Sequence, residues 1–163
     1  MKFAKFARSL SPDGGIIYEY GDEHWLASDS VFMKIPAGVR SVTARDIVKM
    51  PEVFGKIIKQ ECYREYAHLT KAVMPNPAGA FKDCVRIYTS KDKTMNIPIS
   101  NDAWALIEAD DVPEIKYSYD MGADSVNVEA LLINSVDECG NEYIAGVIFA
   151  CDYEEGDEDC GND

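Results

Sequence analysis

Apolar and polar residues alternate over residues 16–20, which predicts a strand with one face on the core. Residues 21–23 (Gly-Asp-Glu) follow, and they are typical of the tight turn of a β-hairpin. The second arm of this hairpin is predicted over residues 24–36. Small and polar residues at 27–29 interrupt that arm, so we expect a bulge or a break between two strands there.

Apolar residues at helical spacing predict helices between residues 43 and 74. Thr43 resembles an N-cap, with Asp46 three residues later, and the apolar positions that follow share one side of a helix: Ile47, Met50, Phe54, Ile57 and Ile58. Pro51 interrupts this segment, so we expect one short helix to end there and a second to begin with it. Further apolar positions continue the helical spacing: Cys62, Tyr66, Leu69 and Val73. At the N-terminus, a shorter set fits a helical turn or a strand equally well: Phe3, Phe6, Ala7 and Leu10.

The second half of the chain is predicted to consist mostly of strands, separated by short polar or glycine-containing segments. The candidates are residues 84–89, 95–99, 103–109, 115–121, 125–134 and 142–151. Residues 103–109 also fit a helix capped by Asn101 or Asp102. The last two candidates meet near Gly140 and predict a closing hairpin. We therefore predict an α+β fold, mainly antiparallel sheet with two or three helices, in a single domain over residues 1–151.

Composition and charge indicate a chain with one hydrophobic core and an acidic surface. The chain has 163 residues, of which 47% are hydrophobic, enough for one core. Its formal net charge is −13, and this charge is unevenly divided. Residues 1–82 hold 12 basic and 9 acidic residues, whereas residues 83–163 hold 4 and 20. A protein surface with this net negative charge repels nucleic acid on average, so any contact with DNA has to be made by a local group of basic residues.

The residues at the two ends of the chain predict which segment is disordered and in which compartment the protein is found. Residues 152–163 contain seven acidic residues and little apolar surface, so we expect a disordered acidic tail. Charged residues are threaded through the first eight positions, which is unlike a signal peptide. The apolar runs are far shorter than the roughly 20 residues of a membrane-spanning helix. We expect a cytoplasmic protein with no membrane contact.

Motifs that carry chemistry are sparse. The two histidines, His24 and His68, have no zinc-ligand spacing, and the five cysteines include no CxxC pair. Glycine-rich phosphate-binding motifs are absent from the sequence. Glu108, Asp110 and Asp111 gather three carboxylates before a proline, which indicates either a magnesium site or, by preference, an ordinary acidic loop. We therefore expect no metal, no cofactor and no catalytic residues, and we lean against an enzyme.

Four basic residues form the candidate binding site. On one uninterrupted helix they would share an arc of about 80° opposite the apolar side: Arg45, Lys49, Lys56 and Lys59. Such a flank is suited to holding DNA phosphates without reading bases. The alternative is an ordinary solvated helix face. A break in the helix at Pro51 would remove the common flank altogether.

Two apolar hairpins resemble parts of the bacterial DNA polymerase III beta subunit, the sliding clamp. In Ile17–Pro36, the stretch Trp25-Leu-Ala-Ser-Asp-Ser-Val-Phe-Met-Lys-Ile35 is similar to the clamp segment where a strand enters Ala-Thr-Asp and then a second strand. The hairpin Val128–Phe149 is similar to the closing hairpin of the clamp's last domain, and Val112–Tyr119 would be the preceding strand. The clamp has three such domains, whereas this chain is long enough for one.

The resemblance implies a DNA-clamp-like fold and a non-enzymatic binding protein associated with DNA replication or its machinery. It also implies duplex DNA or replication proteins as partners. We also expect the chain to form a homo-oligomer, because one domain of this size cannot encircle a DNA duplex.

Two other functions remain open from the sequence. The acidic half of the chain indicates a protein-interaction or DNA-mimic module that blocks a basic partner. A small-molecule enzyme of unknown class would instead use the region of His24 and Trp25, or the carboxylates near Glu108.

Overall fold

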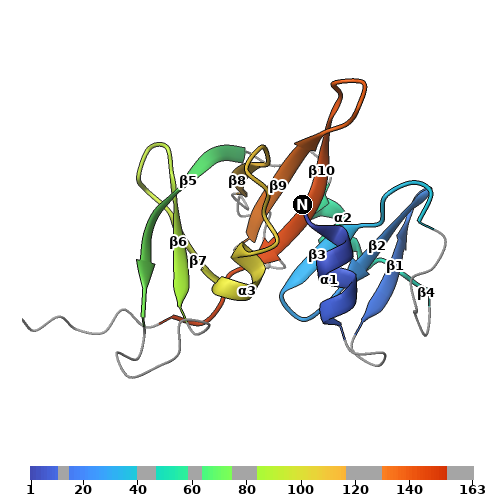
Figure 1. The fold of residues 1–163 in the computed structure, drawn as a ribbon, viewed down its shortest axis with the longest axis horizontal. Helices are drawn as coiled ribbons and strands as arrows, with labels where there is room; N and C mark the ends of the chain where they lie inside the picture. Colours follow the sequence, from blue (N-terminus) through green and yellow to red (C-terminus); the bar gives the residue numbers. More distant parts are fainter. Residues whose placement is uncertain (11–14, 40–46, 59–63, 75–83, 117–129, 154–163) are drawn as a thin grey trace, which may run out of the picture.

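The computed structural model describes residues 1–10, 15–39, 47–58, 64–74, 84–116 and 130–153 (Figure 1). These residues form three short helices and ten strands. In chain order the elements are α1 (Phe3–Ser9), β1 (Ile16–Tyr20), β2 (Glu23–Ala27), β3 (Val31–Lys34), β4 (Ile47–Lys49), α2 (Glu52–Ile58), β5 (Arg64–Val73), β6 (Val85–Ser90), β7 (Asn96–Ser100), α3 (Asn101–Trp104), β8 (Val112–Lys116), β9 (Ala130–Val136) and β10 (Glu142–Phe149).

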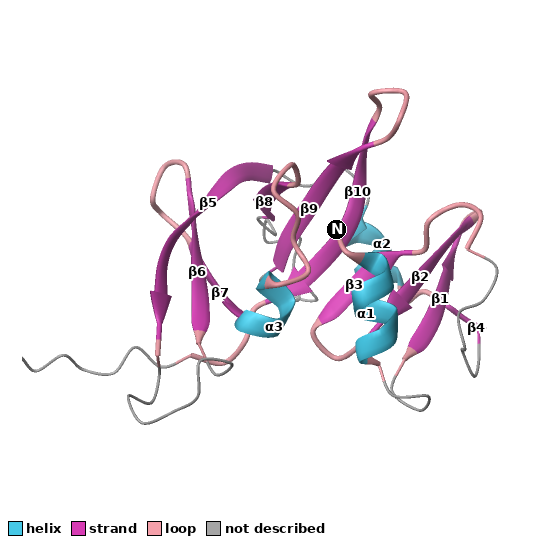
Figure 2. Cartoon of the chain, viewed as in Figure 1, coloured by secondary structure: helices cyan, strands magenta, loops and turns pink. Residues whose placement is uncertain are grey.

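The ten strands belong to one sheet, in the order β4-β1-β2-β3-β10-β9-β8-β5-β6-β7. All neighbouring strands are antiparallel except β1 and β4, which are parallel. Three meanders, β1–β3, β5–β7 and β8–β10, can be followed in Figure 2, and a short helix precedes each of them in the chain. They meet edge to edge through the β3–β10 and β5–β8 pairs. The sheet therefore consists of three antiparallel meanders, each preceded by a short helix in the chain, and β4 extends it at one edge.

This architecture corrects the predicted fold class. The described residues are mainly β rather than α+β, because each of the three helices has seven residues or fewer. The error came from the helices predicted over residues 43–50 and 62–74, of which residues 43–46, 62 and 63 lie outside the described residues. Ile47–Lys49 instead form β4, and Arg64–Val73 form the ten-residue strand β5.

Long-range strand pairing explains why residues 64–73 form a strand although their apolar positions have helical spacing. The first three residues of β5, Arg64–Tyr66, pair with β8, and residues from Ala67 to Val73 pair with β6, so strand pairing extends along its length. Tyr66 and Leu69, predicted to lie on a buried helical stripe, are exposed, whereas Ala67 between them is buried. The second predicted helix is confirmed in residues Glu52–Ile58, where Pro51 immediately precedes it.

Several strand predictions are confirmed. The N-terminal hairpin forms from β1 and β2, and the break expected at residues 27–29 separates β2 from β3. The closing hairpin forms from β9 and β10 around Gly140, whose φ of +83° favours glycine. For residues 103–109 the strand alternative is wrong and the helix alternative is found in part, because Ala103 and Trp104 belong to α3 (Asn101–Trp104). The cap is Ser100, not Asn101 or Asp102, and it accepts a hydrogen bond from the Ala103 amide.

Two apolar clusters lie on opposite faces of the sheet. Residues of α1 and α3 pack on one face, with Leu131 and Ile133 of β9 beneath them. Phe54 and Ile58 of α2 pack on the other face, against the Ala130 side of β9. The first four residues of β9 are thus buried whichever way they point, as expected of a central strand covered on both faces.

The turn after β6 is organised by one carboxylate. Asp92 Oδ1 accepts hydrogen bonds from the Ser90 hydroxyl at 2.6 Å and from the Thr94 amide at 2.9 Å. These bonds favour the ionised form, so the Ser90 hydroxyl and then the Thr94 groups hold the pKa of Asp92 below its usual value. Lys93 in this turn has φ +64°, a left-handed conformation that is costly for a residue with a Cβ atom.

None of the helices in the described residues is both long and apolar enough to cross a membrane. The predicted acidic tail lies outside the described residues from residue 154 onward.

Candidate functional site: an acidic pocket on the sheet

The predicted basic flank is placed on two different elements. Lys49 is the exposed last residue of β4, whereas Lys56 lies in α2. Arg45 and Lys59 lie outside the described residues. Because Lys49 belongs to a strand, it does not share a helical flank with Lys56. DNA binding by these residues stays a prediction.

The three carboxylates of the predicted acidic loop do come together. Ligand oxygens of Glu108, Asp110 and Asp111 lie within 4.8 Å of one another. The α-ammonium of Met1 lies 2.9 Å from the Asp111 carboxylate and 3.1 Å from that of Glu108. Asp111 also accepts a hydrogen bond from the Glu108 amide at 2.8 Å. Two of the three carboxylates therefore already have a counter-ion, and the cluster fastens α1 to the loop after α3.

The region of His24 and Trp25, also considered for an enzyme site, contributes to the hydrophobic core through Trp25. Trp25 is 1% exposed within the core, and its indole N–H donates to Glu23 at 3.3 Å. His24 is exposed, as expected for the neighbouring position of a strand. His68 is exposed on β5. The two histidines thus lie exposed on separate strands, β2 and β5.

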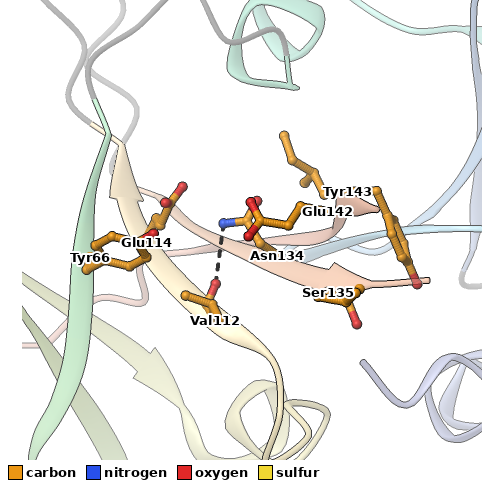
Figure 3. A pocket seen from close by; sticks show the side chains of 9 residues that line it. Tyr66, Val112, Glu114, Asn134, Ser135, Glu142 and Tyr143 are labelled. Atoms are coloured by element: carbon orange, nitrogen blue, oxygen red, sulfur yellow. Dashed lines mark hydrogen bonds between the residues drawn. The ribbon is translucent and has the colours of Figure 1, made fainter. Parts of the chain in front are cut away.

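A pocket of about 220 Å³ lies where β5, β8, β9 and β10 run side by side (Figure 3). In the figure, Tyr66 and Glu114 lie at one end and Tyr143 at the other, with Asn134 and Glu142 between them. The described residues that line it are Tyr66, Val112, Glu114, Asn134, Ser135, Val136, Glu142, Tyr143 and Ile144. Asn134 of β9 donates a long hydrogen bond of 3.4 Å to the carbonyl of Val112, its cross-strand partner in β8.

Strand register assembles this pocket from segments far apart in the sequence. Tyr66 of β5 lies opposite Glu114 of β8, and Val136 of β9 lies opposite Glu142 of β10. Cross-strand partners have Cβ atoms roughly 4.5–5.5 Å apart, so each pair sets an apolar side chain beside a carboxylate.

The pocket combines polar groups with accessible apolar side chains. Four of its residues are large hydrophobic side chains that remain accessible: Tyr66 is 59% exposed, Val136 53%, Val112 39% and Tyr143 38%. Single exposed apolar residues are normal, so the relevant observation is that four of them line the same pocket.

The charges that the described lining residues contribute are all negative. Glu114 and Glu142 belong to the pocket, and the acidic turn containing exposed Glu138 follows β9 directly. Lys34 lies beside Tyr143: its ammonium is 5.6 Å from the centre of that ring and is paired with Glu23. Sequence reasoning missed this site, because it assigned Tyr66 to a helix and used the closing hairpin only for the resemblance to the sliding clamp.

No family model, curated protein or solved structure matches this chain. The resemblance to the sliding clamp therefore stays an expectation.

Proposed function

We propose that this protein is an acidic interaction module that binds a basic segment of a partner protein without catalysing a reaction. The observation that carries the proposal is the pocket on β5, β8, β9 and β10, where accessible apolar side chains lie beside carboxylates. Its described lining holds no lysine, arginine or histidine. The net charge of −13 adds long-range attraction for a basic partner.

The size of the pocket supports a macromolecular partner. A volume of about 220 Å³ is below the roughly 300–1,000 Å³ of sites that enclose small-molecule ligands. A site of this size accommodates one or two side chains that project from a larger binding surface.

Binding of synthetic peptides tests the proposal. We expect a fluorescent peptide rich in lysine, arginine and leucine to bind the full chain, with affinity that falls as salt rises. Glu142→Lys should weaken binding about tenfold or more, because it places a like charge in the pocket. Glu19→Lys makes the same change in net charge at an exposed position of β1 and should have a much smaller effect. Equal effects of the two reversals would locate binding elsewhere, and no binding by the unaltered chain would refute the function.

Duplex DNA is the competing partner, in a clamp-like role in replication. The observation in its favour is the exposed Lys49 on the edge strand β4. Steeply salt-dependent binding of a labelled duplex that Lys49→Glu weakens would support this role. Unchanged anisotropy of the duplex at low salt would eliminate it.

A further inference from the structure

We infer that the pocket recognises a mixed motif, in which an apolar side chain of the partner lies next to lysine or arginine, rather than positive charge alone. This inference rests on the proposed function and specifies the ligand of the same site. It commits the pocket to a short peptide segment of another protein.

The distribution of exposed apolar surface supports the apolar half of the motif. The described residues include nine exposed large hydrophobic side chains, and four of them line this pocket. They come from four different strands, so the sheet itself has brought them together: Tyr66, Val112, Val136 and Tyr143. A ligand that was only basic would leave this surface in water, whereas an apolar side chain would bury it.

The cross-strand pairs support the basic half. Glu142 lies opposite Val136, so a partner residue packed on Val136 places its sequence neighbours within reach of a carboxylate. Lysine and arginine suit this arrangement, because their aliphatic stems cover apolar surface while their charged ends remain at the polar rim.

Tyr143 shows how an aromatic ring of the pocket accommodates a cation. Lys34 already lies 5.6 Å from its ring centre, within the range of a cation–π interaction. Tyr66 is the more exposed of the two tyrosines and offers a second ring of the same kind. The pocket thus presents aromatic, aliphatic and acidic groups together, and each has a counterpart in a mixed basic and apolar segment.

Two peptides of equal length and charge separate this inference from the function on which it rests. One carries leucines between its lysine and arginine residues, and the other carries serines at the same positions. We expect the unaltered chain to bind the leucine peptide about tenfold more tightly, by anisotropy titration at moderate salt. Val136→Ser should reduce this preference to about twofold, and Tyr66→Ser should reduce it independently.

The matched control is Ile47→Ser, which removes an even more exposed apolar side chain from β4, outside the pocket. It should leave the preference for leucine unchanged. Equal binding of the two peptides would overturn the inference while leaving the acidic module intact, and so would equal effects of Val136→Ser and Ile47→Ser. If neither peptide bound, the proposed function itself would fail. Thermal unfolding of each variant verifies that the exposed substitutions leave the fold in place.

Discussion

Replacing Asp111 with asparagine is expected to destabilise the fold strongly, although the two side chains have nearly the same shape. The side chains of Met1 and Asp111 are 1% and 0% exposed, and the Met1 ammonium lies 2.9 Å from each Asp111 oxygen. One of these oxygens also accepts the Glu108 amide. Whichever way the asparagine amide is turned, its NH2 group therefore faces a hydrogen-bond donor, and the ammonium loses its main counter-ion.

The expected loss is about 3–5 kcal/mol, the usual cost of removing one partner of a buried ion pair. For a chain of this length that corresponds to a fall in Tm of roughly 10 °C. Urea unfolding followed by circular dichroism measures the free energy of unfolding, and calorimetry measures Tm. Asp110→Asn is the matched control, because Asp110 is exposed and should change stability by less than about 0.5 kcal/mol.

A second perturbation tests the same ion pair from its other end. Adding two glycines before Met1 converts the ammonium into an amide and should also destabilise the fold. Combined with Asp111→Asn, the two losses should be clearly less than additive, since both remove one interaction. Equal stability of the Asp111→Asn and Asp110→Asn variants would refute the reasoning, and so would full additivity with the extension.

Three other changes have defined outcomes. Lys93→Gly should raise the free energy of unfolding by up to about 1 kcal/mol by relieving the positive φ, whereas Lys91→Gly should not; urea titration distinguishes them. Gly146→Ala should lower Tm, because an added Cβ would overlap the Met1 sulfur, force that side chain to move and lie only 3.0 Å from the Phe32 carbonyl oxygen. The lowered pKa of Asp92 means that its ionised form stabilises the fold above about pH 4, and that this contribution is lost as pH falls through the folded-state pKa. The stability difference between the unaltered chain and Asp92→Asn should accordingly be constant from pH 7 to 5 and shrink below about pH 4.

The carboxylate cluster could be predicted from the sequence only in part, and the pocket could not be predicted from it. Glu108, Asp110 and Asp111 were found as a group because they are neighbours in the chain, but their counter-ion at Met1 lies over 100 residues away in sequence. The pocket has no compact motif at all, since its tyrosines lie in β5 and β10. A usable signal was present in the closing hairpin, where Val136 and Tyr143 flank an acidic turn instead of facing a core.

The sequence by itself determined the parts of the fold that depend on neighbouring residues. Alternation over residues 16–20, the small and polar break at 27–29 and the glycine turn at 140 each act within a few residues, and each is found in the structure. Only the tertiary structure decided that residues 64–73 form a strand. Their spacing also fits a helix, and pairing with β8 over residues 64–66 and with β6 over residues 67–73 outweighs that local preference. The same pairing brought Tyr66 beside Glu114 and so created the acidic pocket, because a site spanning four strands exists only once their register is set.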